Sequence, residues 1–341
     1  MIRDLLSDLC ENFYENRVII QDTFAWERTY IYPVCASVFL DNVIIEDETG
    51  RAYVKEELVD AAKLKYCKEL LKEQTGVFSN FRGRARLPVI CMLAADGEPE
   101  KRLENALEVH DMLRLRFASS EYLPLVATCI AGIADLEKYE DIVYRAKSIY
   151  KLIKDQHPFL TSTEDSIFAA LLAFSEKNDA ELVADMESCY QMLKQRFKAS
   201  NVVQSLSHVL ALGEGEAEYK CQRVFDLYDG LYDKGFKYSK SFELATLGVL
   251  ALLPADIDII VDDIIEAADC LCLKSGYGRW GRFDKKQLLM HAGMVVTSAY
   301  INSSNATMNY TALSSVISMI AAQQAAMCAI IASTAAVSAT T

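Results

Sequence analysis

The side chains that could perform acid–base chemistry in this sequence are four histidines and a few carboxylates. His110, His157, His208 and His291 lie far apart, and their spacing matches none of the patterns in which helical histidines share a metal ion. His157 precedes a carboxylate pair that ends at Asp165, and these groups could act as acid and base. Core packing of the histidines and a helix-capping role for Asp165 are simpler interpretations. We therefore assign no catalytic residue, no cofactor and no metal site.

A second group of candidates lies in the loops that would join each long helix to the following short one. Tyr277 and Trp280 stand beside Arg279 in a glycine-rich loop, and such residues are common at the energetic centres of interfaces. The alternative, which we favour, is that both aromatic side chains pack against the end of the last repeat. The candidate binding surface comprises Phe81, Arg82, Arg84, His157, Thr161, Asp165, His208, Tyr277, Arg279 and Trp280.

The ten cysteines show no metal-binding or disulfide framework. Most of them lie inside apolar helical stretches, as reduced cysteines do when they act as small hydrophobic residues. Cys270 and Cys272 are two residues apart on an expected helix, so they point in different directions and cannot hold one metal ion. This usage predicts a reducing, cytoplasmic location.

Composition and charge exclude several classes of protein. The chain has 341 residues, with 35 basic and 48 acidic side chains and a formal net charge of −13. Nucleic acid would be repelled unless a basic patch existed, and the sequence shows none. Only 6 prolines and 14 glycines occur, which favours helices over the turn-rich sheets of sandwiches and barrels.

A repeat of about forty residues organises the middle of the chain. Aromatic residues close successive long amphipathic segments at spacings of 42, 38, 39 and 41 residues, and small apolar pairs recur at 37, 42, 38 and 40. The aromatic residues are Phe117, Phe159, Phe197, Phe236 and Tyr277, and the pairs begin at Leu93, Ile130, Leu172, Leu210 and Leu250. Two markers in one register predict an all-α array of helical hairpins, an α-solenoid or its closed form, an α/α toroid, without a sheet.

Three regions follow from this pattern. Residues 1–77 form an N-terminal helical cap, with helices expected at 2–24, 25–40 and 54–73 and an acidic loop at 41–51. Residues 78–285 form the hairpin repeats. Residues 286–341 form C-terminal helices that are rich in alanine and serine and carry no charge after Lys286.

The uncharged C-terminal segment, residues 312–339, has three interpretations. Its length could span a bilayer, but Gln323 and Gln324 lie in its middle and no basic residue flanks it. We favour helices packed on the array, because small side chains allow close approach. A surface for self-association is the third interpretation.

Four segments together resemble a bacterial family catalogued only as a domain of unknown function, number four thousand and three. These are TGVFSNFRG (75–83), HPFLT (157–161) with Asp165, LSHVLAL (206–212) and AAQQAAM (321–327). The resemblance covers almost the whole chain and implies a bacterial, cytoplasmic protein. It implies no activity, cofactor or catalytic residue.

The leading functional hypothesis is a scaffold whose curved face or loop edge binds a protein or peptide. An enzyme with an atypical site inside a helical ring, using Asp165, His157 or His208, is the alternative. The third hypothesis is a peripheral membrane protein anchored by residues 312–339.

Overall fold

The computed structural model describes residues 2–25, 27–40, 43–46, 52–156, 165–198, 201–278, 281–305 and 312–337. His157, Thr161, Arg279, Trp280 and the repeat marker Phe159 lie outside these ranges. The described residues contain fifteen α-helices and one two-stranded sheet, so the chain is mostly helical.

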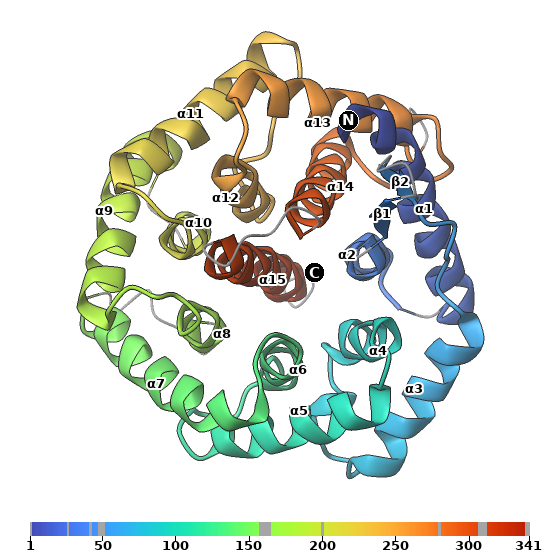
Figure 1. Cartoon of the computed structure of the whole chain (residues 1–341), viewed down its shortest axis with the longest axis vertical. Coiled ribbons are helices and arrows are strands. Elements are labelled where there is room, and N and C mark those ends of the chain that lie inside the picture. Colours follow the sequence, from blue (N-terminus) through green and yellow to red (C-terminus); the bar gives the residue numbers. More distant parts are fainter. Residues whose placement is uncertain are drawn as a thin grey trace.

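Seven long helices circle the molecule and seven shorter or more apolar ones lie inside them (Figure 1). Each outer helix packs against the inner helix that follows it in the sequence. The outer helices are α1 (Ile2–Thr23), α3 (Ala61–Gln74), α5 (Pro99–Arg114), α7 (Tyr139–Gln156), α9 (Asp179–Phe197), α11 (Ala217–Asp233) and α13 (Ile257–Cys272). The inner helices are α2 (Ile31–Ser37), α4 (Arg86–Ala95), α6 (Leu123–Ile133), α8 (Asp165–Leu172), α10 (Asn201–Leu212), α12 (Leu244–Leu252) and α14 (Lys285–Asn305).

The difference between the two layers follows from the distribution of apolar residues. In α8 every residue is buried, whereas α7 buries one face that includes Ile142, Ala146 and Ile149. A helix that is apolar on all sides needs neighbours on all sides, and an amphipathic helix can face water. The Leu-Ala type pairs of the repeat lie at equivalent places, near the ends of α4, α6, α8, α10 and α12, and the first residue of each pair is buried.

The last helix, α15 (Ala312–Val337), lies in the middle of the ring and contacts α6, α8, α10, α12 and α14 (Figure 1). Residues 321–322 and 325–332 are buried, and most of them are alanines, whose small side chains allow several helices to approach closely. The sulfur of Cys129 lies 3.1 Å from Oε1 of Gln324, and Nε2 of Gln323 lies 3.3 Å from Oγ of Ser298. The two glutamines in this apolar segment therefore bind inner helices.

Among the described residues, no helix combines the length and the apolar character needed to cross a bilayer.

The expectation that the chain has no sheet is wrong. Strand β1 (Ile44–Glu46) pairs antiparallel with β2 (Ala52–Val54), with Ile44 opposite Val54. Both strands are only three residues long, which is too short for a period-two pattern to emerge. Their β-branched and aromatic side chains nevertheless suit paired strands, and Val54 and Ile44 are buried.

The helices expected near the N-terminus also differ in extent. The helix expected at 25–40 is α2 followed by a 3-10 turn (Val38–Leu40). The helix expected at 54–73 is α3, which begins only at Ala61, where Oδ1 of Asp60 accepts a hydrogen bond of 2.7 Å from the N–H of Ala62. Two further 3-10 turns, Asn80–Arg82 and Leu136–Lys138, occur between helices.

The first hairpin packs against the last one, because α1 contacts both α13 and α14. Asp263 on α13 is 1% exposed and accepts hydrogen bonds from Nε of Arg3 at 2.9 Å and from the hydroxyl of Tyr300 at 2.8 Å. Arg17 donates to the carbonyl oxygen of Ser275 at 2.8 Å. The contacts of Arg3 and Arg17 join residues about 260 positions apart and connect the two ends of the ring.

Removing the Asp263 carboxylate should weaken this closure. Asp263→Ala removes the carboxylate that accepts from the buried hydroxyl of Tyr300 and from Nε of Arg3, so we expect a loss of about 2–4 kcal/mol in the free energy of unfolding. Urea unfolding followed by circular dichroism measures it. The neighbouring Asp262→Ala is the control, because Asp262 is 42% exposed and should contribute little. Equal effects of the two substitutions would contradict the assignment.

Candidate functional site

The two ends of the ring differ in the connections between helices that lie there. At one end the outer helices connect to the inner helices that follow them. At the other end each inner helix finishes and the next outer helix begins, so carbonyl groups of the inner helices are exposed there unless side chains bind them.

Phe81, Arg82 and Arg84 lie in the connection between α3 and α4. Phe81 is buried, with its ring edge-on to His110 at 5.0 Å between centroids. Arg82 donates to the carbonyl oxygens of Lys72 and Thr75 and so caps α3, while Arg84 forms an ion pair of 3.3 Å with Glu121. All three have structural contacts at this position.

Asp165 and His208 lie on neighbouring inner helices. Asp165 is the first residue of α8 and is buried, and His208 lies in the middle of α10 with no exposed surface. Phe168, one turn after Asp165, packs on the His208 ring at 4.8 Å between centroids. The two residues thus lie on helices that contact each other, while the described part of the chain does not include His157 or Thr161.

Tyr277 lies in the connection between α13 and α14 and is 6% exposed. Gly276, directly before it, has a φ of 94°, a left-handed conformation that glycine adopts without strain. The Tyr277 hydroxyl and Nδ1 of His291 on α14 are hydrogen-bonded at 2.8 Å. Burial, and then the nearby Arg17, lowers the pKa of His291 to about 3. Tyr277 thus holds the last hairpin together.

His291 should make the protein less stable in mild acid. The pKa of His291 is 6.5 in the unfolded chain and lower in the folded protein. Below pH 6.5 the unfolded chain therefore binds a proton that the folded protein does not, and the free energy of unfolding falls as the pH decreases towards 3. Between pH 7 and 4.5 this residue should remove about 2–3 kcal/mol from the free energy of unfolding. Urea titrations of the protein and of His291→Gln at both pH values measure it. The substituted protein should show the smaller decline, and identical declines would disprove this role for His291.

At the opposite end of the ring, basic side chains bind the carbonyl groups where inner helices finish. Arg145 on α7 donates to the carbonyl oxygens of Ala173, Ser175 and Lys177. Equivalent carbonyl groups are bound two hairpins later by an arginine on α11, with each partner 78 positions further along the chain. There Arg223 donates to the carbonyl oxygens of Ala251, Leu253 and Ala255 at 2.6–2.8 Å. A cation at the C-terminus of a helix also opposes the helix dipole.

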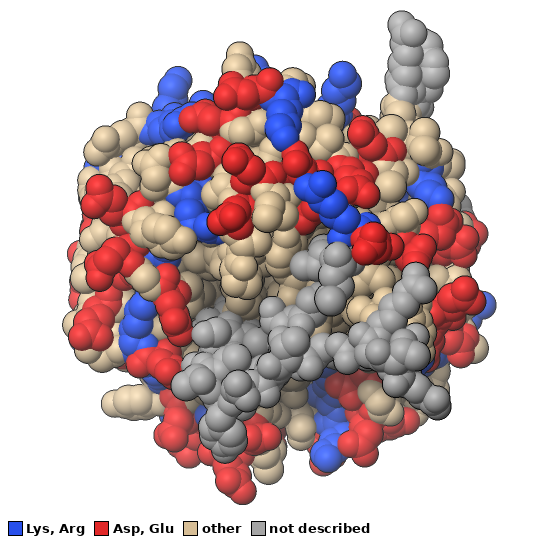
Figure 2. Space-filling view, turned by 45° about the horizontal axis from the view of Figure 1, so that its top comes forward, with Lys and Arg blue, Asp and Glu red and all other residues tan. Residues whose placement is uncertain are grey.

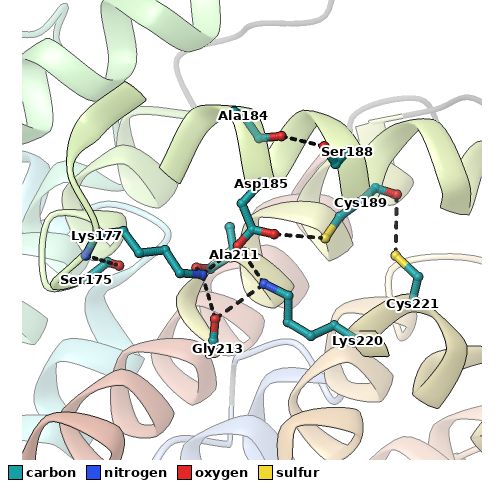
Figure 3. A network of polar contacts seen from close by, with 10 residues as sticks. All are labelled: Ser175, Lys177, Ala184, Asp185, Ser188, Cys189, Ala211, Gly213, Lys220 and Cys221. Carbon is teal, nitrogen blue, oxygen red and sulfur yellow. Dashed lines mark hydrogen bonds and ion pairs between the residues drawn. The ribbon is translucent and has the colours of Figure 1, made fainter. Parts of the chain in front are cut away.

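In the hairpin between these two, an aspartate and two lysines take the place of the arginine (Figure 3). Asp185 accepts from Lys177 at 2.5 Å and from Lys220 at 2.6 Å. Lys177 donates to the carbonyl oxygens of Ala211 at 3.1 Å and Gly213 at 2.8 Å. Burial lowers the pKa of Lys220, while its contacts with Cys189 and Asp185 oppose that shift. Asp185 therefore balances the positive charge of the buried Lys220.

Removing Asp185 should be costly for this reason. Asp185→Ala leaves Lys220, which is 1% exposed, without its counter-ion, and we expect a loss of about 3 kcal/mol in the free energy of unfolding. The double variant Asp185→Ala/Lys220→Met removes the unpaired charge and should recover most of that loss. Urea unfolding of the two variants measures the difference. A double variant no more stable than the single one would contradict the account.

A cavity of about 580 Å³ opens at the same end of the ring. It lies between the segment after β2, the ends of α4 and α6, the start of α5, and the helices α14 and α15. Its charged lining residues are Lys55, Glu57, Asp60, Lys63, Asp96 and Arg102, and its buried lining residues include Met92, Ala94, Cys129 and Asn302.

Arg102 and Asp96 form the most structured part of this wall. Nη1 of Arg102 lies 2.9 Å from Oδ2 of Asp96, and Nη2 lies 3.2 Å from the carbonyl oxygen of Thr128. The buried Nε of Arg102 has no hydrogen-bond partner. A Cβ at Gly132 would lie 2.0 Å from Nη2 of Arg102, so glycine at this position leaves room for the guanidinium. Lys63 donates to the carbonyl oxygen of Asp96 at 2.7 Å.

These groups suit recognition rather than metal ligation. Three cations and three anions line one cavity, and amides of Asn302 and Gln324 add neutral donors and acceptors. Within the described ranges, no group of three or more His, Cys, Asp or Glu residues is placed to hold a metal ion. The size falls within the roughly 300–1,000 Å³ of ligand pockets.

The sequence analysis did not identify this cavity. Its residues come from six separate segments, and none of them forms a recognisable motif. The only local signal is a basic residue near the start of an outer helix, such as Lys63 or Arg102, which ordinarily marks a solvated surface.

The outer surface is mainly acidic. Figure 2 shows acidic side chains spread over the outer helices with basic ones between them, and no continuous basic patch appears on the face drawn. This distribution agrees with the net charge of −13.

Comparison with known proteins places the chain in a family. The model of a family described as Protein of unknown function (DUF4003) matches residues 45–325. Uncharacterized protein YeaA of Bacillus subtilis (strain 168) is 26% identical over 275 residues, which cover 78% of this chain and 80% of that protein. No solved structure matches. Because the family model spans most of the sequence, the chain belongs to the DUF4003 family of proteins of unknown function.

Proposed function

We propose that the protein is a closed α/α toroid that binds a peptide segment of a partner in the cavity formed by Lys55, Lys63, Asp96 and Arg102. The single observation that carries this proposal is the cavity of about 580 Å³ with charges of both signs on its wall. The proposal keeps the binding-scaffold hypothesis but moves the binding site from the curved inner face to one end of the ring.

The position of α15 motivates this change. In an open array the inner helices would offer a concave surface to a partner. Here α15 contacts five inner helices and buries that surface. A partner must therefore bind at an end of the ring or on its outer wall.

The chemistry of the wall favours a peptide over a purely apolar ligand. Lys55, Glu57 and Asp60 are exposed and lie on the segment that leads into α3. Lys55 and Glu57 form an ion pair with each other, and charged side chains or termini of a peptide can replace these partners. Met92 and Ile133 provide apolar contacts beside them. The side-chain amide of Gln324 can form hydrogen bonds with the backbone amides of a peptide.

A cytoplasmic location is part of this proposal. All ten cysteines are free thiols, eight of them buried, which supports a reducing compartment.

Filling the cavity should abolish peptide binding without unfolding the protein. Ala95 is exposed and lines the cavity, so Ala95→Trp should occupy space there and weaken binding by about tenfold or more. The measurement is calorimetric titration with charged tri- to pentapeptides, selected first by thermal shift. Ala180→Trp is the matched control, because Ala180 is an exposed alanine on α9 that does not line the cavity. Equal affinity of the two variants, or no binding by the unmodified protein at millimolar peptide, would refute the proposal.

A further inference from the structure

The cysteines that are scattered in the sequence come together as pairs in the fold. Four pairs of thiols, each on two different helices, lie close enough for one thiol to affect the pKa of the other. With ten cysteines in 341 residues and roughly 6–12 neighbours around each buried side chain, random placement would give about one such pair. The pairs are Cys10 with Cys270, Cys35 with Cys91, Cys129 with Cys328, and Cys189 with Cys221.

One pair differs from the other three in its access to solvent. Cys270 is partly exposed, whereas Cys10 and all members of the other pairs are buried. Cys270 lines an open surface groove of about 450 Å³ together with Glu266, Asp269 and Leu273. The sulfur of Cys10 lies 3.6 Å from the carbonyl oxygen of Ala267, one helical turn before Cys270. An accessible thiol beside a buried one is the arrangement of an attacked and a resolving cysteine.

We propose that Cys10 and Cys270 are an oxidisable dithiol that a peroxide converts into a disulfide across the junction of the first and last hairpins. Hydrogen peroxide transfers one oxygen to the Cys270 sulfur, which becomes a sulfenic acid while the peroxide is reduced to water. The Cys10 sulfur then attacks the Cys270 sulfur, and the hydroxyl group leaves as water with the thiol proton. Two thiols and one peroxide thus give one disulfide and two waters.

The charges around Cys270 determine how fast this happens. Burial raises the pKa of Cys270, and the carboxylates of Glu266 and Asp269 raise it further, while Cys10 and the ammonium of Lys274 oppose the shift. Lys274 is itself held by Glu11 on α1. The thiolate fraction is therefore small, so oxidation is slow and accelerates as the pH rises. The acidic groove favours a neutral oxidant over an anionic one.

The product would lock the ring. Cys10 lies on α1 and Cys270 on α13, the two helices that the Arg3–Asp263 contact also joins. A covalent link between them closes a loop of about 260 residues and prevents the first and last hairpins from separating.

The test uses the full-length protein in its native state. The protein is incubated with hydrogen peroxide, blocked with N-ethylmaleimide, digested without reduction and analysed by mass spectrometry. We expect a Cys10–Cys270 linked peptide, faster migration on a non-reducing denaturing gel, and an unfolding midpoint several degrees higher that dithiothreitol reverses. Cys270→Ser should lose all three effects.

Cys272→Ser is the matched control, because Cys272 lies on the same helix and is also partly exposed. It should retain the linked peptide and the shift. Cys10→Ser should leave Cys270 as a sulfenic acid or a more oxidised acid, and Cys270→Ser decides the outcome if the buried substitution does not fold. A first disulfide at another pair, a link only between chains, or loss of the effect in Cys272→Ser would overturn the proposal.

Discussion

The constraint on which this structure depends is that most of the inner helices are apolar on every side. Such helices cannot face water, so they need protein both outside and inside the circle that they form. The amphipathic outer helices cover one side. On the other side α15 fills the middle, and its alanines allow it to contact five helices at once (Figure 1). Residues 321–322 and 325–332 of this uncharged helix are therefore part of the core.

The second requirement is electrostatic. Inner helices that run in the same direction bring their final carbonyl groups to one end of the ring, where they need donors. Arg145 and Arg223 supply them from equivalent positions on outer helices. On α9 Asp185 occupies the equivalent position. There Lys177 and Lys220 bind the carbonyl groups at the end of α10, and the carboxylate of Asp185 balances their positive charges (Figure 3). One packing role is thus fulfilled by two different sets of side chains.

These two requirements also restrict where the protein can bind anything. The centre is occupied, and Phe81, Arg82 and Tyr277 at one end are engaged in structural contacts. The cavity at the other end is lined by the segment that follows β2 and by the ends of α4 and α6. This is the place in the ring where the proposed ligand would bind.

The sequence by itself determined the helical class, the period of about forty residues and the two kinds of helix, because each depends on the local spacing of apolar residues. The three-residue strands escaped detection because their pattern is shorter than a period can reveal. Only the tertiary structure decided that Arg3 meets Asp263, that Cys10 meets Cys270, and that Lys63, Asp96, Arg102 and Gln324 share one cavity. These contacts depend on the angle between each hairpin and the previous one. That angle is set by the packing between helices, which no local sequence pattern encodes.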